Sequence, residues 1–239
     1  MRKLISFITL AVIAASLAFA FAHIPFGEHD LGVARYYLTE GLKQTGAVNL
    51  VTSVVVNYRG LDTLGEITVL FIAAVGLGTI LFAAGTTPTH VSRKVEPEAR
   101  PASLILRTGT RLLFPFILVF GIYVFLHGHL TPGGGFQGGA IIASAFLLVY
   151  LAFPRQRTAR QSFQVIESLG GLTFVGIGLI GLIVSGSFLI NFLPKGAPRS
   201  LFSAGIIPII YIAVGLKVGF ELTGVIGDLL RREANASDL

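Results

Sequence analysis

Lys217 and Glu221 are charged residues inside a long apolar run near the end of the chain. A charged side chain at the centre of a bilayer costs about 2.5–3.5 kcal/mol on insertion scales, so such residues persist mainly where they meet a partner or line an aqueous path. Their four-residue spacing places both on one face of a helix, and one interpretation is an ion pair within that helix. The other is a buried lysine that gains and loses a proton. The residues leave both interpretations open.

Glu66 opens a second apolar run, three residues after Thr63. This spacing favours a capping box, in which Thr63 is the helix N-cap and Glu66 reaches back to the Thr63 amide. The alternative is a titratable carboxylate one turn inside the membrane, able to pass protons. Two further acids, Glu167 and Asp228, stand near the ends of apolar runs, and we expect them at the membrane interface.

His127 and His129 close an apolar run just before a glycine-rich turn. Imidazole is a common metal ligand, but two histidines without a nearby carboxylate or third ligand make a weak site, so we predict no metal. A proton relay at the membrane face is one interpretation, because histidine titrates near neutrality. A structural pair that closes the helix with hydrogen bonds is the other.

Five glycines fill the segment that follows: Gly133, Gly134, Gly135, Gly138 and Gly139. Their four-residue spacings are those that let membrane helices approach closely, and we predict a helix-packing motif. The segment lacks the Gly-Lys-Ser/Thr ending of a phosphate loop. No Ser-His-Asp set or pair of catalytic carboxylates stands in a soluble segment. We therefore expect neither an enzyme active site nor a cofactor in this chain.

The composition is typical of an integral membrane protein. Hydrophobic residues make up 53% of the 239 residues and charged residues 13%, against roughly 25% charged in soluble domains. Several runs reach the ~20 apolar residues needed to cross a bilayer. The chain has no cysteine, which excludes disulfides, thiol catalysis and iron–sulfur sites. We interpret the net charge of +6 as setting topology, not as a sign of nucleic-acid binding.

We predict an all-α, polytopic fold with six transmembrane helices, at about Leu4–Ala22, Leu64–Ala84, Leu112–His127, Phe136–Phe153, Leu169–Leu193 and Ser203–Leu229. The first run also has features of a signal peptide, but it is long enough to span. Pro115 is expected to kink the third helix and Pro208 to break the sixth. Leu50–Val56 is too short to span, which leaves an interfacial helix or a partly inserted one.

Basic residues gather at the N-terminus, in the linker 85–107, in the loop 154–162 and at the C-terminus. The loops 128–136 and 194–202 carry only Lys195 and Arg199. By the positive-inside rule, both termini should be cytoplasmic. The linker is also rich in proline, and it is the best internal boundary.

Two stretches resemble known families of membrane subunits. Over about residues 102–230 the chain closely resembles the B subunit (MnhB domain) of Mrp-type multisubunit cation/proton antiporters. The motifs that carry this resemblance are Ser103-Leu104-Ile105-Leu106-Arg107, Arg111-Leu112-Leu113-Phe114-Pro115, Leu126-His127-Gly128-His129 and Pro132-Gly133-Gly134-Gly135-Phe136-Gln137-Gly138-Gly139. Upstream, Tyr58-Arg59-Gly60-Leu61-Asp62-Thr63-Leu64-Gly65-Glu66 resembles the C-terminal end of the antiporter A subunit and the small E-type chain of energy-converting membrane hydrogenases.

The resemblance implies an E-type membrane segment (1–95) fused to an MnhB-like four-helix domain (96–239). Near the C-terminus, the segments 201–208 and 213–219 look more like the version in membrane-bound hydrogenase or sulfane reductase complexes. The resemblance further implies a multi-pass subunit of a prokaryotic cell membrane, inner or plasma. It would serve a Na⁺/H⁺ exchange module, either free-standing or coupled to a redox complex.

Partners and path residues are also implied by the resemblance. The partners are A-, C-, D-, F- and G-type membrane subunits, the lipid bilayer, Na⁺ and H⁺, and hydrogenase-like redox subunits in the coupled case. The resemblance favours a role in an ion or proton path for Glu66 and Lys217; we predict that Glu221, His127 and His129 also contribute to this path, although the resemblance leaves the role of the two histidines open. In the family, the glutamate that matches Glu66 lies at a proposed proton or sodium route. This favours a role of Glu66 in ion or proton transfer over the capping box.

Two other interpretations compete with an ion path. In the first, the chain is a purely structural assembly subunit, whose glycine faces hold larger chains together and whose charges are caps and ion pairs. In the second, it is a self-contained solute carrier. Many carriers show an inverted repeat with broken helices, and this pattern is not visible in the sequence.

Overall fold

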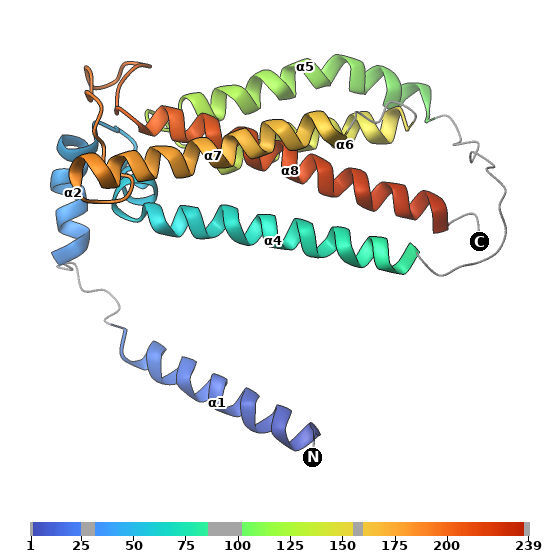
Figure 1. Ribbon diagram of the computed structural model, residues 1–239, viewed down its shortest axis with the longest axis horizontal. Coiled ribbons are helices and arrows are strands. Elements are labelled where there is room, and N and C mark those ends of the chain that lie inside the picture. Colours follow the sequence, from blue (N-terminus) through green and yellow to red (C-terminus); the bar gives the residue numbers. More distant parts are fainter. Residues whose placement is uncertain (1, 25–31, 86–101, 155–159, 237–239) are drawn as a thin grey trace. The chain divides into compact units, whose positions relative to one another are not determined.

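The computed structural model describes residues 2–24, 32–85, 102–154 and 160–236, and all regular structure in these ranges is helical (Figure 1). The elements are α1 (Arg2–Ala22), α2 (Gly32–Thr45), α3 (Leu50–Thr52), the π-helix η1 (Ser53–Tyr58), α4 (Gly60–Gly85), α5 (Leu104–Leu126), α6 (Gly135–Ala152), α7 (Arg160–Ser185) and α8 (Ile207–Ala236). Within these ranges six helices are long and apolar enough to cross a membrane: α1, α4, α5, α6, α7 and α8. The all-α fold with six candidate spans is therefore confirmed, and the cytoplasmic position of the termini stays a prediction.

Two compact units divide the chain, Met1–Tyr36 and Tyr37–Leu239. In the first unit, α1 exposes large apolar side chains on every side, Leu4, Phe7 and Phe19 among them. A helix that is apolar all round fits a lipid environment.

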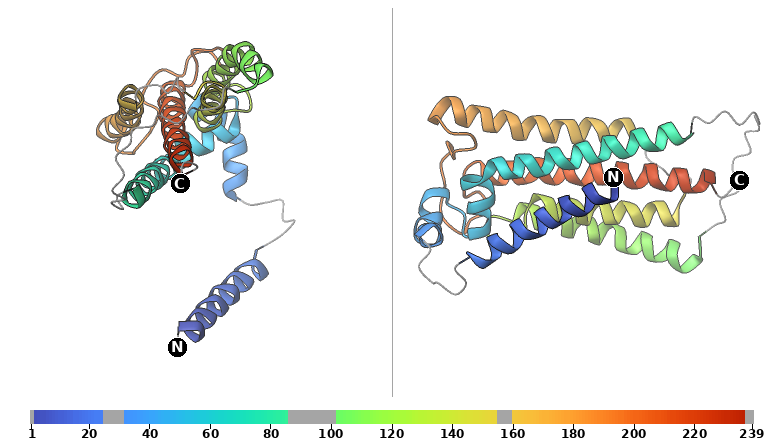
Figure 2. Two further views of the ribbon diagram at one scale, coloured as in Figure 1. Left: turned by 90° about the vertical axis from the view of Figure 1, so that its right-hand side faces the viewer. Right: turned by 90° about the horizontal axis from the view of Figure 1, so that it is seen from below.

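Helix α8 forms the centre of the second unit. It packs against α4, α5, α6 and α7, and the end-on view in Figure 2 shows it among these helices. Ile207, Ile210 and Val218 of α8 are fully buried, and together with Phe174 of α7 they belong to the hydrophobic core. Polar groups on α8 are therefore largely shielded from lipid by the chain itself.

Helix α5 begins at Leu104, earlier than the predicted Leu112. Ser103 is its N-cap, and its hydroxyl oxygen accepts a hydrogen bond of 3.2 Å from the Leu106 amide. The last residues of the predicted linker are thus the first turn of a helix. Pro115 lies within α5 and does not end it.

Helices α7 and α8 also depart from the predicted bounds. α7 ends at Ser185, because Gly186 follows with a φ of +75°, a left-handed conformation that glycine adopts without steric cost. α8 begins at Ile207, so Pro208 lies in its first turn, where the missing amide proton breaks no helical bond. The predicted break at Pro208 is therefore wrong.

The segment Leu50–Val56 is part of α3 and η1, two short helical elements that run into α4. Asn49 is the N-cap of α3 and accepts a bond of 3.1 Å from the Val51 amide. Figure 1 shows these elements at the same end of the second unit as the loop between α7 and α8. The predicted domain boundary at 95/96 lies outside the described residues.

Candidate functional site

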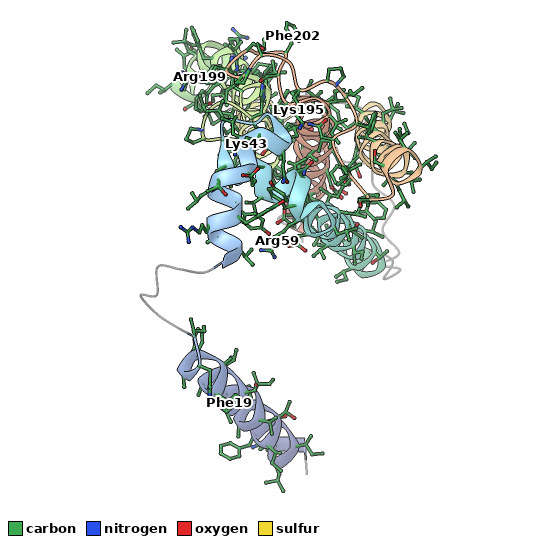
Figure 3. The ribbon with its side chains drawn as sticks, turned by 90° about the vertical axis from the view of Figure 1, so that its left-hand side faces the viewer. Phe19, Lys43, Arg59, Lys195, Arg199 and Phe202 are labelled. Carbon is green, nitrogen blue, oxygen red and sulfur yellow. The ribbon has the colours of Figure 1, made fainter. Side chains whose placement is uncertain are left out.

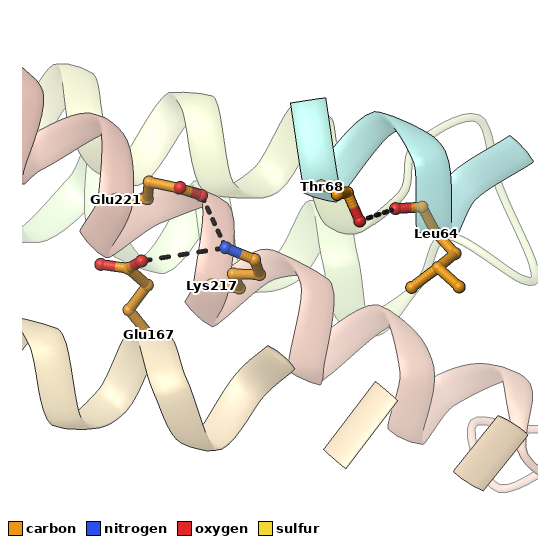
Figure 4. Close-up of polar contacts among 5 residues, drawn as sticks. All are labelled: Leu64, Thr68, Glu167, Lys217 and Glu221. Carbon is orange, nitrogen blue, oxygen red and sulfur yellow. Dashed lines mark hydrogen bonds and ion pairs between the residues drawn. The ribbon is translucent and has the colours of Figure 1, made fainter. Parts of the chain in front are cut away.

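Lys217 lies between two carboxylates in the second unit. Its Nζ donates a hydrogen bond of 2.8 Å to Glu221 Oε2, one turn further along α8, and lies 3.8 Å from Glu167 Oε1 of α7 (Figure 4). Lys217 is 7% exposed and Glu221 only 3%. The ion pair suggested by the four-residue spacing is present, and it belongs to a cluster of three charged side chains from two helices. We call Lys217, Glu221 and Glu167 the lysine–carboxylate cluster.

A glycine brings α7 close to α8 beside this cluster. A Cβ atom at Gly170 would lie 2.6 Å from Ala213 O and 3.1 Å from Lys217 Cβ, so no side chain fits there without parting the helices. Glu167 lies one turn earlier on α7 and is thereby held within reach of the ammonium group. From the side of α4, the ring of Phe71 lies 5.3 Å from Lys217 Nζ, a cation–π distance. Three helices therefore surround the lysine.

A cavity of about 370 Å³ adjoins the cluster, and residues of α4, α7 and α8 line it. Three carboxylates contribute to its wall: Glu167, Glu221 and Asp228. Glu221 Oε1 is buried and has no hydrogen-bond partner in the described structure. An ionised oxygen in that position is costly. A proton, a water molecule or a cation at Glu221 Oε1 would lower this cost, so the site is suited to exchanging a proton or cation.

Glu66 lies on α4 and is not part of the cluster. Because α4 begins at Gly60, Thr63 is inside the helix, and its hydroxyl donates to Val55 O at 2.8 Å. The capping box is therefore wrong. The Glu66 side chain is exposed and forms no hydrogen bond or ion pair with any described residue. It remains an available carboxylate on the outer surface of α4.

The two histidines lie in the turn between α5 and α6. His127 is the C-cap of α5, and its ring stacks on Tyr123 with the ring centres 4.2 Å apart. His129 is fully buried; its Nε2 lies 3.4 Å from Ser200 O, and its Nδ1 has no partner among the described residues. Burial lowers the pKa of His129 below the ordinary 6.5, against the opposing effect of its hydrogen bonds to backbone carbonyls. Burial therefore favours the neutral form of His129.

Polar side chains also connect the segment before α4 to the turn between α5 and α6. Asn49 Nδ2 donates to Gly128 O at 2.8 Å and to Thr131 O at 2.9 Å. The Thr52 hydroxyl donates to Gly128 O at 2.6 Å and accepts a bond of 2.8 Å from the Tyr211 hydroxyl of α8. These bonds connect the segment before α4 to the turn between α5 and α6 and to α8.

Asn191 makes a second connection of this kind from the loop between α7 and α8. Its Nδ2 donates to Thr45 O at 3.1 Å and to Ala204 O at 3.0 Å. We call the side chains of Asn49, Thr52, Asn191 and Tyr211 the seam network. At the surface of the same end, Lys195 Nζ donates to Lys43 O at 2.9 Å, and Figure 3 labels both residues. Sequence reasoning missed the seam network, because single polar residues scattered over four segments show no spacing signal.

The glycine-rich segment packs inside the chain. A Cβ atom at Gly138 would lie 2.7 Å from Gly121 O of α5, and one at Gly139 would lie 2.8 Å from Gly215 O of α8. Helix α6 therefore meets both neighbours through its backbone. Gly133 and Gly135 are equally confined, with their nearest atoms, Val124 O and Val214 Cβ, at 2.7 Å. Gly134 is less confined, because the atom 2.7 Å from its added Cβ is the end of the flexible Gln137 side chain.

Lys217 and Glu221 are the two predicted path residues that the fold brings into contact. Glu66, His127 and His129 lie on other elements and do not touch them. Glu167 was expected at the interface because α7 was predicted to begin after it. The pair Gly170-Gly171, which follows Glu167 by one turn, was the available signal that this turn of α7 packs closely on another helix.

Two family descriptions match the chain, and together they cover most of it. Residues 105–224 match a domain related to the MnhB subunit of Na⁺/H⁺ antiporters, and residues 1–90 match MbhE, the E-type chain of MBH. An uncharacterised protein of Methanocaldococcus jannaschii is 33% identical, over 91% of this chain and 87% of its own length. The putative antiporter subunit mnhB2 of Staphylococcus haemolyticus is 43% identical over 82 residues, which span 34% of this chain and 52% of that relative.

Two solved structures share the fold. A chain of the membrane-bound sulfane sulfur reductase, an archaeal respiratory membrane complex, is 48% identical with a TM-score of 0.75, over 96% of this chain and 98% of that one. A chain of the Mrp complex from Dietzia sp. DQ12-45-1b is 28% identical with a TM-score of 0.72. That match covers 95% of this chain and 26% of the longer Dietzia chain.

Proposed function

Because the chain belongs to the family related to the MnhB subunit of Na⁺/H⁺ antiporters, with an N-terminal part of the MbhE family, we propose that it forms part of the ion path of such a complex. It is a membrane subunit of a cation antiporter-like assembly, and other membrane subunits are its partners. The exchanged ions would be Na⁺ and H⁺, and the partners would be of the A, C, D, F and G types.

One observation carries the proposal, namely a buried lysine held between two carboxylates beside a cavity. Lys217 and Glu221 would exchange a proton, and Glu167 would keep a negative charge beside Lys217 as the proton moves. Glu66 would act at the surface of α4 and pass protons to a neighbouring subunit. His127 and His129 would form a relay at the membrane face. The domain boundary would lie near 95/96, between the two family matches.

The nearly complete overlap with a chain of a respiratory complex favours a redox-coupled module over a free-standing exchanger. In that case electron transfer in other subunits would drive ion movement, and this chain would act as a transporter subunit. The location would be the inner or plasma membrane of a prokaryotic cell.

The test uses the complex that co-purifies with this chain in mild detergent, with its subunits identified by mass spectrometry. Coupled Na⁺/H⁺ exchange is then measured in liposomes for Lys217→Arg, Lys217→Ala and Glu66→Gln. Arginine keeps the positive charge but does not lose its proton in proteins. We expect Lys217→Arg to assemble normally and to transport at least about tenfold more slowly, which corresponds to a barrier raised by about 1.4 kcal/mol.

Lys195→Ala is the matched control, because this exposed lysine makes one surface hydrogen bond far from the cluster. Normal exchange in a fully assembled Lys217→Arg complex would overturn the proton-transfer role. If Lys217→Arg restores what Lys217→Ala loses, the cluster is a structural ion pair and the assembly interpretation is correct.

A further inference from the structure

Two arginines at the start of α5 share one aromatic ring. Arg107 Cζ lies 5.6 Å and Arg111 Cζ 5.4 Å from the centre of the Phe153 ring, which belongs to the C-cap residue of α6. The four-residue spacing makes the two guanidinium groups neighbours on one helix face. Neither side chain forms a hydrogen bond or ion pair with any residue that the structure describes.

Two like charges at this spacing repel each other. A cation–π contact at an exposed site contributes only about 0.5–1 kcal/mol, and it supplies no opposite charge. The donors of a guanidinium group form a rigid fork that matches a phosphate group in bidentate fashion. Among the described residues, the pair therefore has the charge and the unused donors that a phosphate needs.

The position of the pair at a span end favours a phosphate carried by a lipid. Leu104–Leu126 is a candidate membrane span, and both arginines lie in its first turns. Further into the span and on the same helix face, at four and eight residues from Arg111, α5 exposes Pro115 and Val119 (66%). A headgroup phosphate at the level of the arginines would place its acyl chains alongside these apolar residues.

We propose that Arg107, Arg111 and Phe153 form a binding site for the phosphate of an anionic membrane lipid. The ring fixes both guanidinium groups at one place, the two groups bind the phosphate, and the apolar face of α5 contacts an acyl chain. Basic pockets between membrane helices are suited to such headgroups. The site is separate from the lysine–carboxylate cluster of α7 and α8, so each proposal can fail without the other.

Native mass spectrometry of the delipidated complex tests the site. The complex is exposed to phosphatidylglycerol or to zwitterionic phosphatidylcholine, and the lipid retained on this chain is counted. Each basic residue near an anionic headgroup contributes about 1 kcal/mol, so the double variant Arg107→Gln/Arg111→Gln should bind phosphatidylglycerol about thirtyfold more weakly. Arg111→Lys keeps the charge without the planar fork and should lose only a few-fold.

Arg199→Gln is the matched control, because Arg199 is an exposed arginine in the loop at the opposite end of the second unit (Figures 1 and 3). Equal retention of phosphatidylglycerol by the double variant and the wild type would overturn the proposal. So would an equal loss caused by Arg199→Gln, or displacement of the lipid by millimolar inorganic phosphate alone, which indicates a soluble anion. Loss of a partner subunit from the double variant, with lipid retention unchanged, would assign the arginines to a protein contact instead.

Discussion

The cost of burying Lys217 is offset by its immediate neighbours. An isolated ammonium group inside a bilayer-spanning helix is expensive. Here two carboxylates and one aromatic ring surround it, and one of the carboxylate oxygens, Glu221 Oε1, still has no partner among the described residues. Replacing a buried ion pair by apolar residues is often neutral or stabilising, so such a pair is weak evidence for stability alone. Stability alone therefore gives no reason to keep these charges, which is consistent with the proposed ion path.

His129 predicts a pH dependence of stability. Its pKa is lowered in the folded chain, so the unfolded chain takes up a proton at a higher pH than the folded one. The stabilising contribution is fully present above the ordinary value of 6.5 and is lost as the pH falls through the window below it. We expect thermal unfolding of the complex in detergent to occur at lower temperature at pH 5.5 than at pH 7.5.

Part of that difference should disappear in His129→Gln, whose amide can still bond to Ser200 O but does not titrate. His127→Gln is the control, because His127 is only half buried and stacks at the helix end. An unchanged pH dependence in His129→Gln would show that other groups cause it.

At the scale of elements, the sequence predicted which segments are helical better than it predicted where the helices end. Long apolar runs are a strong signal, so all six spans were found. The predicted helix ends were wrong in two situations. A charged residue inside a helix, such as Arg107, was assigned to a loop, and an apolar run that continues past a glycine turn, as at Gly186, was assigned to one helix. A stop of this kind depends on one backbone dihedral, and hydrophobicity carries no information about it. The start of α7 was also placed too late, at Leu169 in place of Arg160, and this error left Glu167, the third member of the cluster, outside its helix.

Glycines on α7 and α4 divide into those that pack inside the chain and those that face away. Gly170 meets Ala213 O, whereas Gly76 and Gly176 have nothing within 4 Å of an added Cβ atom. Gly170→Leu should lower the stability of the chain by about 1–3 kcal/mol through overpacking and separate Glu167 from Lys217. Gly176→Leu should leave the stability of the isolated chain unchanged, as measured by thermal unfolding.

The same pair tests the assembly role. If α7 uses its smooth outer face to meet another subunit, Gly176→Leu should remove that subunit from the purified complex while the chain stays folded. Retention of every subunit would show that this face contacts lipid. Gly135 and Gly219 are unsuited to this test, because a Cβ atom added at either position would meet atoms of the chain itself, Val214 Cβ at 2.7 Å and Gly139 O at 3.3 Å.

At the scale of the whole molecule, the two family matches meet in one compact unit. The contacts between them are apolar where α4 packs on α8, and polar at the end formed by the seam network. Buried polar bonds between segments fix one arrangement more strictly than apolar packing does, because a shifted partner leaves donors unpaired. The carboxylates and the lysine of α7 and α8 thus face Phe71 of α4 in a fixed register.

This arrangement predicts that residues 1–95 and 96–239 associate when they are produced as two chains. The cut falls between the two family matches, and the seam network bridges it through Asn49, whose side chain donates to Gly128 O and Thr131 O. Each such bond contributes about 0.5–1.5 kcal/mol, so Asn49→Ala should weaken association of the two pieces about tenfold or more.

Asn57→Ala is the matched control, since the Asn57 Oδ1 atom has no partner among the described residues. Co-purification of the pieces through a tag on one of them, followed at increasing detergent concentration, measures the effect. Equal yields for both variants would show that α4 and α8 hold the pieces together through apolar packing alone, and that the polar bonds of the seam network do not fix their register.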